Sequence, residues 1–264
     1  LDAVVVPVNP MNKAEELKHY ITDPDTRVAI TTADQGSEWA TASNALPLQE
    51  RLKHLVITHL ADAFGDKAAD DMPHAWRDWL LTHHAEPMLA GGACHAWSTV
   101  MQAVERAVQS AALPLPPVTA TSQDLSILPY TSGTTGLPKG VMHTHGSIMH
   151  NAVAVGLWSN SSGETVSLCA VPMFHITGLV SVMQATIYGG GTLVIMPRWD
   201  RELAGRVISR HKVTHWGNIP TMVIDLLASP SFEQYDLSSL VSIGGGGAAM
   251  PQAVAQRLWE QFGL

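Results

Sequence analysis

The stretch Leu125-Ser-Ile-Leu-Pro-Tyr-Thr-Ser-Gly-Thr-Thr-Gly-Leu-Pro-Lys-Gly-Val-Met-His-Thr144 says most about how this chain folds. Residues 125–130 are apolar enough to form a strand, residues 131–138 are dense in Gly, Ser and Thr, and residues 140–144 again favour an extended chain. A helix is expected next, from about Ser147 to Trp158. The stretch therefore predicts two strands that flank a polar loop and lead into a helix.

The polar loop offers the groups that a polyphosphate needs. Its glycines let the backbone bend so that N–H groups converge, its hydroxyls can donate hydrogen bonds, and Lys139 supplies positive charge. At an effective dielectric constant near 20 and a separation of roughly 4 Å, one ammonium–phosphate contact is worth about 4 kcal/mol before desolvation. The candidate phosphate-binding residues are Thr131, Ser132, Gly133, Thr134, Thr135, Gly136 and Lys139.

The spacing excludes a Walker A loop. Counted from Gly133, the second glycine of that pattern would fall on Pro138, and Lys139 is followed by Gly140 rather than by Ser or Thr. From these residues alone, a polar turn that binds no ligand stays open as the alternative.

Strands and helices are expected to alternate on both sides of the loop, which indicates an α/β fold with parallel sheets. Before the loop, Asn12 is expected to cap a helix that ends near Tyr20. The expected strands are 3–8, 27–32, 55–58, 166–171, 191–196, 213–216 and 240–244, and a helix is expected over 252–262.

Composition limits the class of protein. The chain has 264 residues, of which 46% are hydrophobic, so it can bury a sizeable core. Its 23 acidic and 15 basic residues give a net charge of −8, which argues against nucleic acid as a partner. The apolar runs are too short for an integral membrane segment. The two cysteines, Cys94 and Cys169, do not suggest a disulfide framework, so we expect a soluble protein of the reducing cytoplasm.

No metal site is expected within the chain. The pairs His83-His84 and Cys94-His95 invite a metal, but adjacent residues rarely converge on one ion without further ligands. We expect these side chains to be solvated or to serve packing.

The run Tyr130–Gly140, followed by Val141-Met-His-Thr-His145, closely resembles the signature loop of the adenylate-forming family. That family includes acyl-CoA synthetases, firefly luciferase and the adenylation domains of peptide synthetases. The resemblance implies that the loop embraces the β- and γ-phosphates of ATP while a substrate carboxylate attacks the α-phosphorus. It also implies a catalytic role for Lys139.

Two further segments resemble the same family. Pro172-Met-Phe-His-Ile-Thr-Gly178 is similar to its aromatic and histidine segment, which implies that His175 is catalytic and lies beside the carboxylate and the α-phosphate. Taken alone, a histidine between Phe174 and Ile176 is more often a packed core residue. Trp216, Gly217 and Asn218 lie where the family often lines its acyl pocket, although plain packing explains the tryptophan equally well.

The segment Ser242-Ile-Gly-Gly-Gly-Gly-Ala-Ala-Met-Pro251 has two possible interpretations beyond a bare glycine-rich turn. Gly244-x-Gly246-x-x-Ala249 fits the dinucleotide fingerprint of a Rossmann-type oxidoreductase. The segment also resembles the family's Gly-Gly-Ala-Pro-Leu sequence, with alanine at position 249 where the family has proline. This resemblance implies that adenine lies against the backbone of Gly246, Gly247, Ala248 and Ala249.

The family resemblance implies the fold and the reaction. We expect two stacked βα subdomains of the large N-terminal domain, over 1–160 and 165–264, with the small C-terminal domain absent. A carboxylic acid, fatty or similar, would react with ATP to give an acyl-adenylate, and coenzyme A would then form the thioester. The oligomeric state is left open.

The resemblance also implies that some of the site lies outside this sequence. The glutamate that helps to hold Mg²⁺, an aspartate for the ribose and a catalytic lysine are expected beyond Leu264. We therefore expect the chain alone to be inactive. A module that binds nucleotide without catalysis is the alternative function.

Overall fold

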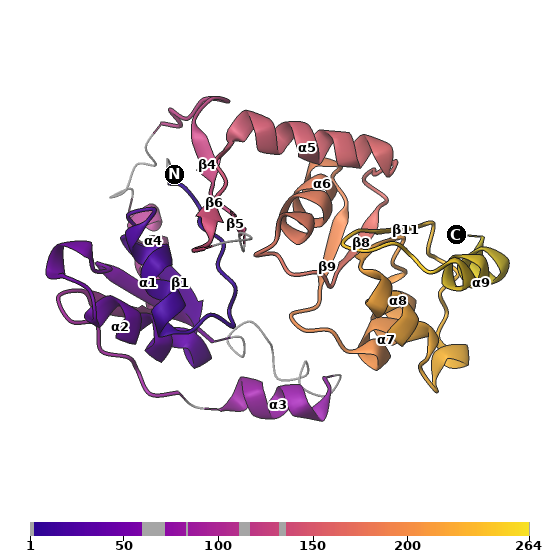
Figure 1. Ribbon diagram of the computed structural model, residues 1–264, viewed down its shortest axis with the longest axis horizontal. Helices are drawn as coiled ribbons and strands as arrows, with labels where there is room; N and C mark the ends of the chain where they lie inside the picture. The colour runs from indigo at the N-terminus through magenta and orange to yellow at the C-terminus, as the bar shows by residue number, and fades with distance from the viewer. Residues whose placement is uncertain (1–2, 60–71, 83, 111–116, 132–135, 264) are drawn as a thin grey trace. The chain divides into compact units, whose positions relative to one another are not determined.

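The computed structural model describes residues 3–59, 72–82, 84–110, 117–131 and 136–263. The chain forms two compact units (Figure 1). The first unit comprises residues 1–119 and 130–140, and the second comprises 120–129 and 141–264. The chain therefore passes from one unit to the other at three places, after Thr119, after Pro129 and after Gly140.

A three-stranded parallel sheet in the order β1-β2-β3 forms the centre of the first unit. Val28 pairs with His54, and His54 pairs with Ala93. The strands confirm the predictions for residues 27–32 and 55–58 to within one residue. The elements are α1 (Ala14–Thr22), β1 (Val28–Thr32), η1 (Ala33–Gln35), α2 (Gly36–Asn44), η2 (Leu48–Glu50), β2 (His54–Thr58), α3 (His74–Leu81), β3 (Ala93–Ala96) and α4 (Trp97–Gln109).

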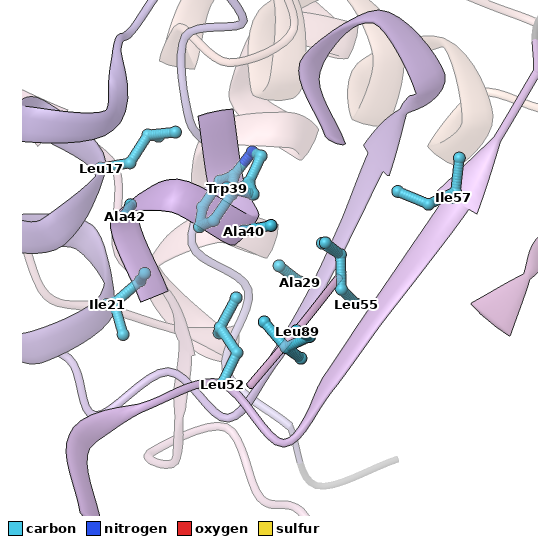
Figure 2. Close-up of a cluster of buried hydrophobic side chains, with 10 residues drawn as sticks. All are labelled: Leu17, Ile21, Ala29, Trp39, Ala40, Ala42, Leu52, Leu55, Ile57 and Leu89. Atoms are coloured by element: carbon cyan, nitrogen blue, oxygen red, sulfur yellow. The ribbon is translucent and has the colours of Figure 1, made fainter. Parts of the chain in front are cut away.

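Helix α1 is fixed to the core of this unit by an apolar stripe. Leu17 and Ile21 are one turn apart and almost fully buried, and they pack in one cluster with Trp39 of α2 and Leu55 of β2 (Figure 2). Burying an aliphatic side chain of this size is worth roughly 1.5–3 kcal/mol. The last turn of α1 is thus held rigidly.

Two predictions at the start of the chain are wrong. Lys13, not Asn12, occupies the N-cap position of α1; its backbone N–H donates to Glu16 Oε2 at 2.8 Å, and the N–H of Ala14 donates to Glu38 Oε2 at 2.9 Å. The helix therefore uses carboxylates from positions 16 and 38 in place of an asparagine cap. Residues 3–8 form no strand apart from one bridge at Val5.

The second unit is built on a four-stranded parallel sheet in the order β11-β10-β8-β9. These strands confirm the four predicted after the loop, and the helix predicted over 252–262 is α9. The elements are α5 (His145–Trp158), β8 (Val166–Cys169), the π-helix η5 (Thr177–Gln184), α6 (Ala185–Tyr188), β9 (Thr192–Ile195), α7 (Arg201–His211), β10 (His215–Asn218), α8 (Pro220–Leu227), η6 (Phe232–Gln234), β11 (Ser242–Gly245) and α9 (Gln252–Phe262).

Each of the two extended segments around the loop is divided between the units. Residues 125–130 form β4 (Leu125–Ile127) and β5 (Tyr130–Thr131), and residues 139–144 form β6 (Lys139–Gly140) and β7 (His143–Thr144). In the second unit β4 pairs antiparallel with β7, and in the first β5 pairs antiparallel with β6. Pro129 separates β4 from β5 because it has no N–H to donate to a ladder.

Helix α5 belongs to the second unit because it packs there. Ile148 and Ala152 form a buried cluster with Ile127 and Val180. The hydroxyl of Thr144 caps the helix by accepting from the N–H of Ser147 at 3.1 Å, so α5 starts slightly before the predicted position. The two compact units therefore have other boundaries than the predicted ranges 1–160 and 165–264. Those ranges remain a proposal about the subdomains of an intact enzyme.

Among the helices that the structure describes, none is both long enough and apolar enough to cross a membrane.

Candidate functional site

The candidate phosphate-binding loop, residues 131–139, is called the phosphate loop below, and its two ends are joined by a short ladder in the first unit. Tyr130 pairs with Gly140 and Thr131 pairs with Lys139. Gly136 has φ of +147°, a conformation that favours glycine, and it is exposed. Of the predicted phosphate-binding residues, Ser132, Gly133, Thr134 and Thr135 lie outside the described residues.

Lys139 stands at the end of this loop with its side chain in solvent. Thr131, its partner across the ladder, is also exposed. Within the ranges that the structure describes, no ion pair of Lys139 is seen. Its ammonium group is therefore available to an anion.

In the first unit, side chains in and just after the last turn of α1 contact the two ends of the phosphate loop, which we call the loop base (Tyr130 and Pro138). The ring of His19 donates from Nε2 to the carbonyl oxygen of Pro138 at 2.7 Å, since a carbonyl can only accept. Tyr130 donates its hydroxyl to Asp23 Oδ2 at 2.5 Å. Burial, together with the Asp23 carboxylate, raises the pKa of the Tyr130 phenol, so the phenol stays protonated and keeps donating. None of these three side chains was predicted as a site residue.

Aromatic contacts complete this support. The Tyr130 ring lies 4.7 Å from the Tyr20 ring and 5.6 Å from the His19 ring, measured between centroids. It also lies so close to Gly140 that a Cβ there would be 3.1 Å from the phenol carbon. The glycine at position 140 therefore lets the strand pass directly over the ring.

In the second unit, sheet topology brings the other candidates to one edge. Strands β8, β10 and β11 are parallel neighbours, so their carboxyl ends meet at the same edge of the sheet. The segment that carries His175 follows β8, Asn218 ends β10, and Gly246 follows β11. Open α/β sheets bind ligands at the carboxyl ends of their strands.

His175 is exposed, and its tautomer is set by the backbone. Its Nδ1 accepts from the N–H of Thr177 at 3.2 Å, so a neutral ring carries its proton on Nε2. Gly178 lies so close to Pro172 that a Cβ would be 2.4 Å from its carbonyl oxygen. The spacing of proline, histidine and glycine therefore makes a tight turn that leads into η5. Among the residues that the structure describes, His175 Nε2 has no hydrogen-bond partner.

The three predicted acyl-pocket residues alternate between the faces of β10. Trp216 is buried, stacks on Trp199 at 5.8 Å, and lines a small apolar cavity with Val223 of α8 and Leu258 of α9. Gly217 faces η5, where a Cβ would be 2.4 Å from Val182. Trp216 thus packs in the core, and its place in an acyl pocket stays a prediction.

Asn218 is fully buried, and only one of the two polar atoms of its side-chain amide has a hydrogen-bond partner among the described residues. Its Nδ2 donates to the Trp216 carbonyl at 3.0 Å, while Oδ1 has no partner among the described residues. A Cβ on Gly245 would lie 2.9 Å from this oxygen. Glycine at position 245 is therefore required for β11 to lie beside the amide.

The glycine segment after β11 presents bare backbone. Gly246, Gly247, Ala248 and Ala249 are exposed, and Gly247 has φ of +82°. A Cβ built on Gly246 meets nothing within 4 Å. Helix α9 starts only at Gln252, so the segment is a loop and not the tight strand-to-helix turn of a dinucleotide fingerprint.

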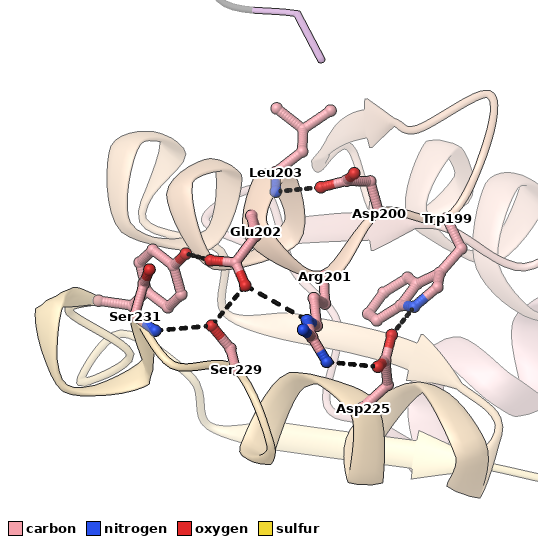
Figure 3. Close-up of polar contacts among 9 residues, drawn as sticks. Trp199, Asp200, Arg201, Glu202, Leu203, Asp225, Ser229 and Ser231 are labelled. Atoms are coloured by element: carbon pink, nitrogen blue, oxygen red, sulfur yellow. Dashed lines mark hydrogen bonds and ion pairs between the residues drawn. The ribbon is translucent and has the colours of Figure 1, made fainter. Parts of the chain in front are cut away.

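A polar network that was not predicted fixes the loop after β9 (Figure 3). Asp225 of α8 accepts from Trp199 Nε1 at 2.8 Å and from Arg201 at 3.2 Å. Glu202 accepts from the hydroxyls of Tyr235 and Ser229, which hold the pKa of its carboxyl below the ordinary value. The network joins α7 to α8 and keeps Trp199 stacked on Trp216.

Within the described ranges, no three His, Cys, Asp or Glu side chains gather in a way that could hold a metal ion.

The chain is similar in sequence to known CoA ligases. The chain is 39% identical to a long-chain-fatty-acid–CoA ligase of Bacillus subtilis over 53% of its length, and 35% identical to a 4-coumarate–CoA ligase of Pinus taeda over 56%. These matches cover 25% and 28% of the relatives, so the chain matches only about a quarter of their length.

The fold is shared with a solved structure of a red-emitting luciferase from Phrixothrix hirtus. The TM-score is 0.72 at 20% identity, over 99% of this chain and 44% of the luciferase chain. The model of the AMP-binding enzyme family matches residues 1–264, which removes the support for a Rossmann-type oxidoreductase. The chain belongs to the AMP-binding enzyme family.

Proposed function

We propose that this chain is the nucleotide-binding part of an enzyme that activates a carboxylic acid with ATP. Family membership and one structural observation support the proposal: Lys139 stands exposed at the end of a loop whose two ends are held together by a ladder. The acid attacks the α-phosphorus of ATP through its carboxylate oxygen, the bond to the bridging oxygen breaks, and pyrophosphate leaves.

The loop acts on the leaving group. Lys139 and the hydroxyls and N–H groups of residues 131–136 neutralise charge on the β- and γ-phosphates, and this charge grows as pyrophosphate departs. Preorganised charge of this kind is usually the largest single contribution to such a reaction.

The edge of the second sheet acts on the reacting acid and on adenine. His175 donates from Nε2 to an oxygen of the carboxylate or of the α-phosphate. Adenine lies against the backbone of 246–249, where the open space beside Gly246 leaves room for a flat ring. The segment Trp216–Asn218 forms part of the acyl pocket, with Gly217 on the face of β10 toward η5 and Trp216 and Asn218 packed on the opposite, buried face.

The substrate is a fatty or similar carboxylic acid, and the acyl group then passes to coenzyme A. Support comes from the relatives, which are named as ligases of long-chain fatty acids and of 4-coumarate to coenzyme A. Mg²⁺ would neutralise charge on the phosphates of ATP when bound, and the glutamate that the family resemblance assigns to it is not among residues 1–264. A cytoplasmic location is part of the proposal.

The test is acid-dependent exchange of labelled pyrophosphate into ATP, with calorimetric titration of ATP alongside. Exchange that requires a fatty or aromatic acid supports the proposal. ATP binding without exchange, in the protein that contains this chain, would favour a nucleotide-binding module. Absence of both would overturn the proposal. Comparing the 264 residues alone with a longer form tests the expectation that the chain alone is inactive.

A further inference from the structure

We propose that the last turn of α1, together with its C-cap residue Asp23, is a positioning platform for the phosphate loop, with His19 and Asp23 as its two positioning residues. The inference rests on the proposed function, because it assigns residues that act on the phosphate loop without touching ATP. The platform consists of His19, Tyr20 and Asp23, and it contacts Tyr130 and Pro138.

The ladder that closes the loop is too short to hold its own shape. Strands β5 and β6 have two residues each, and an isolated two-stranded hairpin is marginal in water even when it is longer. Charge stabilisation at a transition state requires donors that are already in place. The loop therefore needs support from outside the ladder.

The platform supplies that support to both limbs of the loop. On the first limb, Asp23 accepts from the Tyr130 hydroxyl at 2.5 Å. On the second, His19 donates to the carbonyl of Pro138 at 2.7 Å, and this peptide unit provides the backbone nitrogen of Lys139. The orientation of the backbone at Lys139 is thus set by a side chain of α1.

The platform itself is rigid. Leu17 and Ile21 anchor the same turns of α1 in the buried cluster of the first unit, with exposures of 2% and 0%. Motion of the loop base must therefore strain the contacts of His19 and Asp23 and cannot simply carry the helix along.

The experiment compares two matched phenol-to-carboxylate contacts. Tyr130→Phe and Asp23→Ala break the contact at the loop, and Tyr235→Phe breaks the contact with Glu202 in the other unit. We expect the first two to raise KM for ATP about fivefold or more and to weaken pyrophosphate binding similarly, with KM for the acid within about twofold. Tyr235→Phe is expected to leave both KM values unchanged. Thermal unfolding of each variant reports any loss of fold.

His19 provides an independent arm with a rescue. His19→Leu removes the donor to Pro138 and is expected to raise KM for ATP about fivefold, whereas His19→Gln keeps an N–H donor and is expected to recover most of the loss. A merely structural role would move stability in both variants without separating KM for ATP from KM for the acid.

The results separate failure of this inference from failure of the proposed function. If wild type exchanges pyrophosphate and the variants at positions 19, 23 and 130 behave as Tyr235→Phe does, the platform is wrong and the function stands. If wild type exchanges with no acid, the function fails, and calorimetry with pyrophosphate on the same variants still decides the platform. Equal affinity across them would overturn it.

Discussion

The base of the phosphate loop and the glycine segment after β11 solve the same problem in opposite ways. In the proposed function, both present backbone groups to a nucleotide. The loop base is held by side chains of a distant helix, through the contacts of His19 and Asp23. The glycine segment is exposed and takes its shape from local backbone freedom, with Gly247 at positive φ. The loop base should therefore be sensitive to substitutions that are distant in sequence. The glycine segment should be sensitive only to substitutions within the segment.

The largest effect is expected where the loop delivers its charge. Lys139→Ala should slow acid-dependent pyrophosphate exchange about tenfold or more, because about 1.4 kcal/mol of lost transition-state stabilisation already gives a factor of ten. Lys139→Arg should retain part of the rate. Lys53→Ala, which removes another exposed lysine of the same unit, is the control. An unchanged rate in Lys139→Ala would remove this residue from the mechanism.

The edge of the second sheet is tested next. His175→Ala should lower the rate of exchange about tenfold, because it removes the free Nε2 donor. His175→Gln places an N–H near the same position and should recover part of the rate. If the His175→Gln and His175→Ala variants exchange equally slowly, the imidazole ring does more than donate one hydrogen bond. If both variants exchange as fast as wild type, His175 is not catalytic.

Local backbone freedom is tested by paired glycine substitutions. Gly247→Ala forces a side chain into the left-handed region and should lower the free energy of unfolding by about 1–2 kcal/mol. Gly246→Ala, beside open space, should change it by less than about 0.5 kcal/mol. Urea unfolding of the two variants decides. Equal losses would mean that the segment is held by contacts after all.

The smallest effect is expected in the polar network that joins α7 to α8 (Figure 3). Hydrogen bonds from Tyr235 and Ser229 lower the pKa of Glu202 below its ordinary value. A carboxyl with a lowered folded-state pKa stabilises the fold above its unfolded-state pKa of about 4.3, and this contribution is lost as pH falls through the folded-state pKa. Wild type should therefore exceed Glu202→Gln in stability at pH 7 by a few tenths of a kcal/mol, and the gap should close in acid. A gap that is constant with pH would contradict this.

Local patterns predicted much of the fold and of the candidate site. The four strands of the second sheet, and β1 and β2 of the first, follow from short apolar runs, and the loop was identified from its glycines, hydroxyls and Lys139. Strand β3 (Ala93–Ala96) was not predicted, because Ala-Cys-His-Ala is not an apolar run. The free donor of His175 also depends on neighbours within three residues. Such features are visible in sequence because the interacting groups lie close together along the chain.

Long-range features were missed for the opposite reason. His19 and Pro138 are 119 residues apart, and Asp23 and Tyr130 are 107 apart, so no local pattern links them. The division of residues 125–130 between β4 and β5 was missed likewise, because it depends on which strand each half finds as a partner. The proline at position 129 was the one available signal.

The three crossings of the chain between the units have a consequence for recombination among relatives. Residues 130–140 are flanked on both sides by segments of the second unit, yet they fold with the first. A chimera joined near residue 119 would inherit its phosphate motif from one parent and the α1 residues that hold it from the other. Residues 130–140 of one parent would then pack against the α1 helix of the other. A chimera that keeps these contacts has to take residues 130–140 and α1 from the same parent.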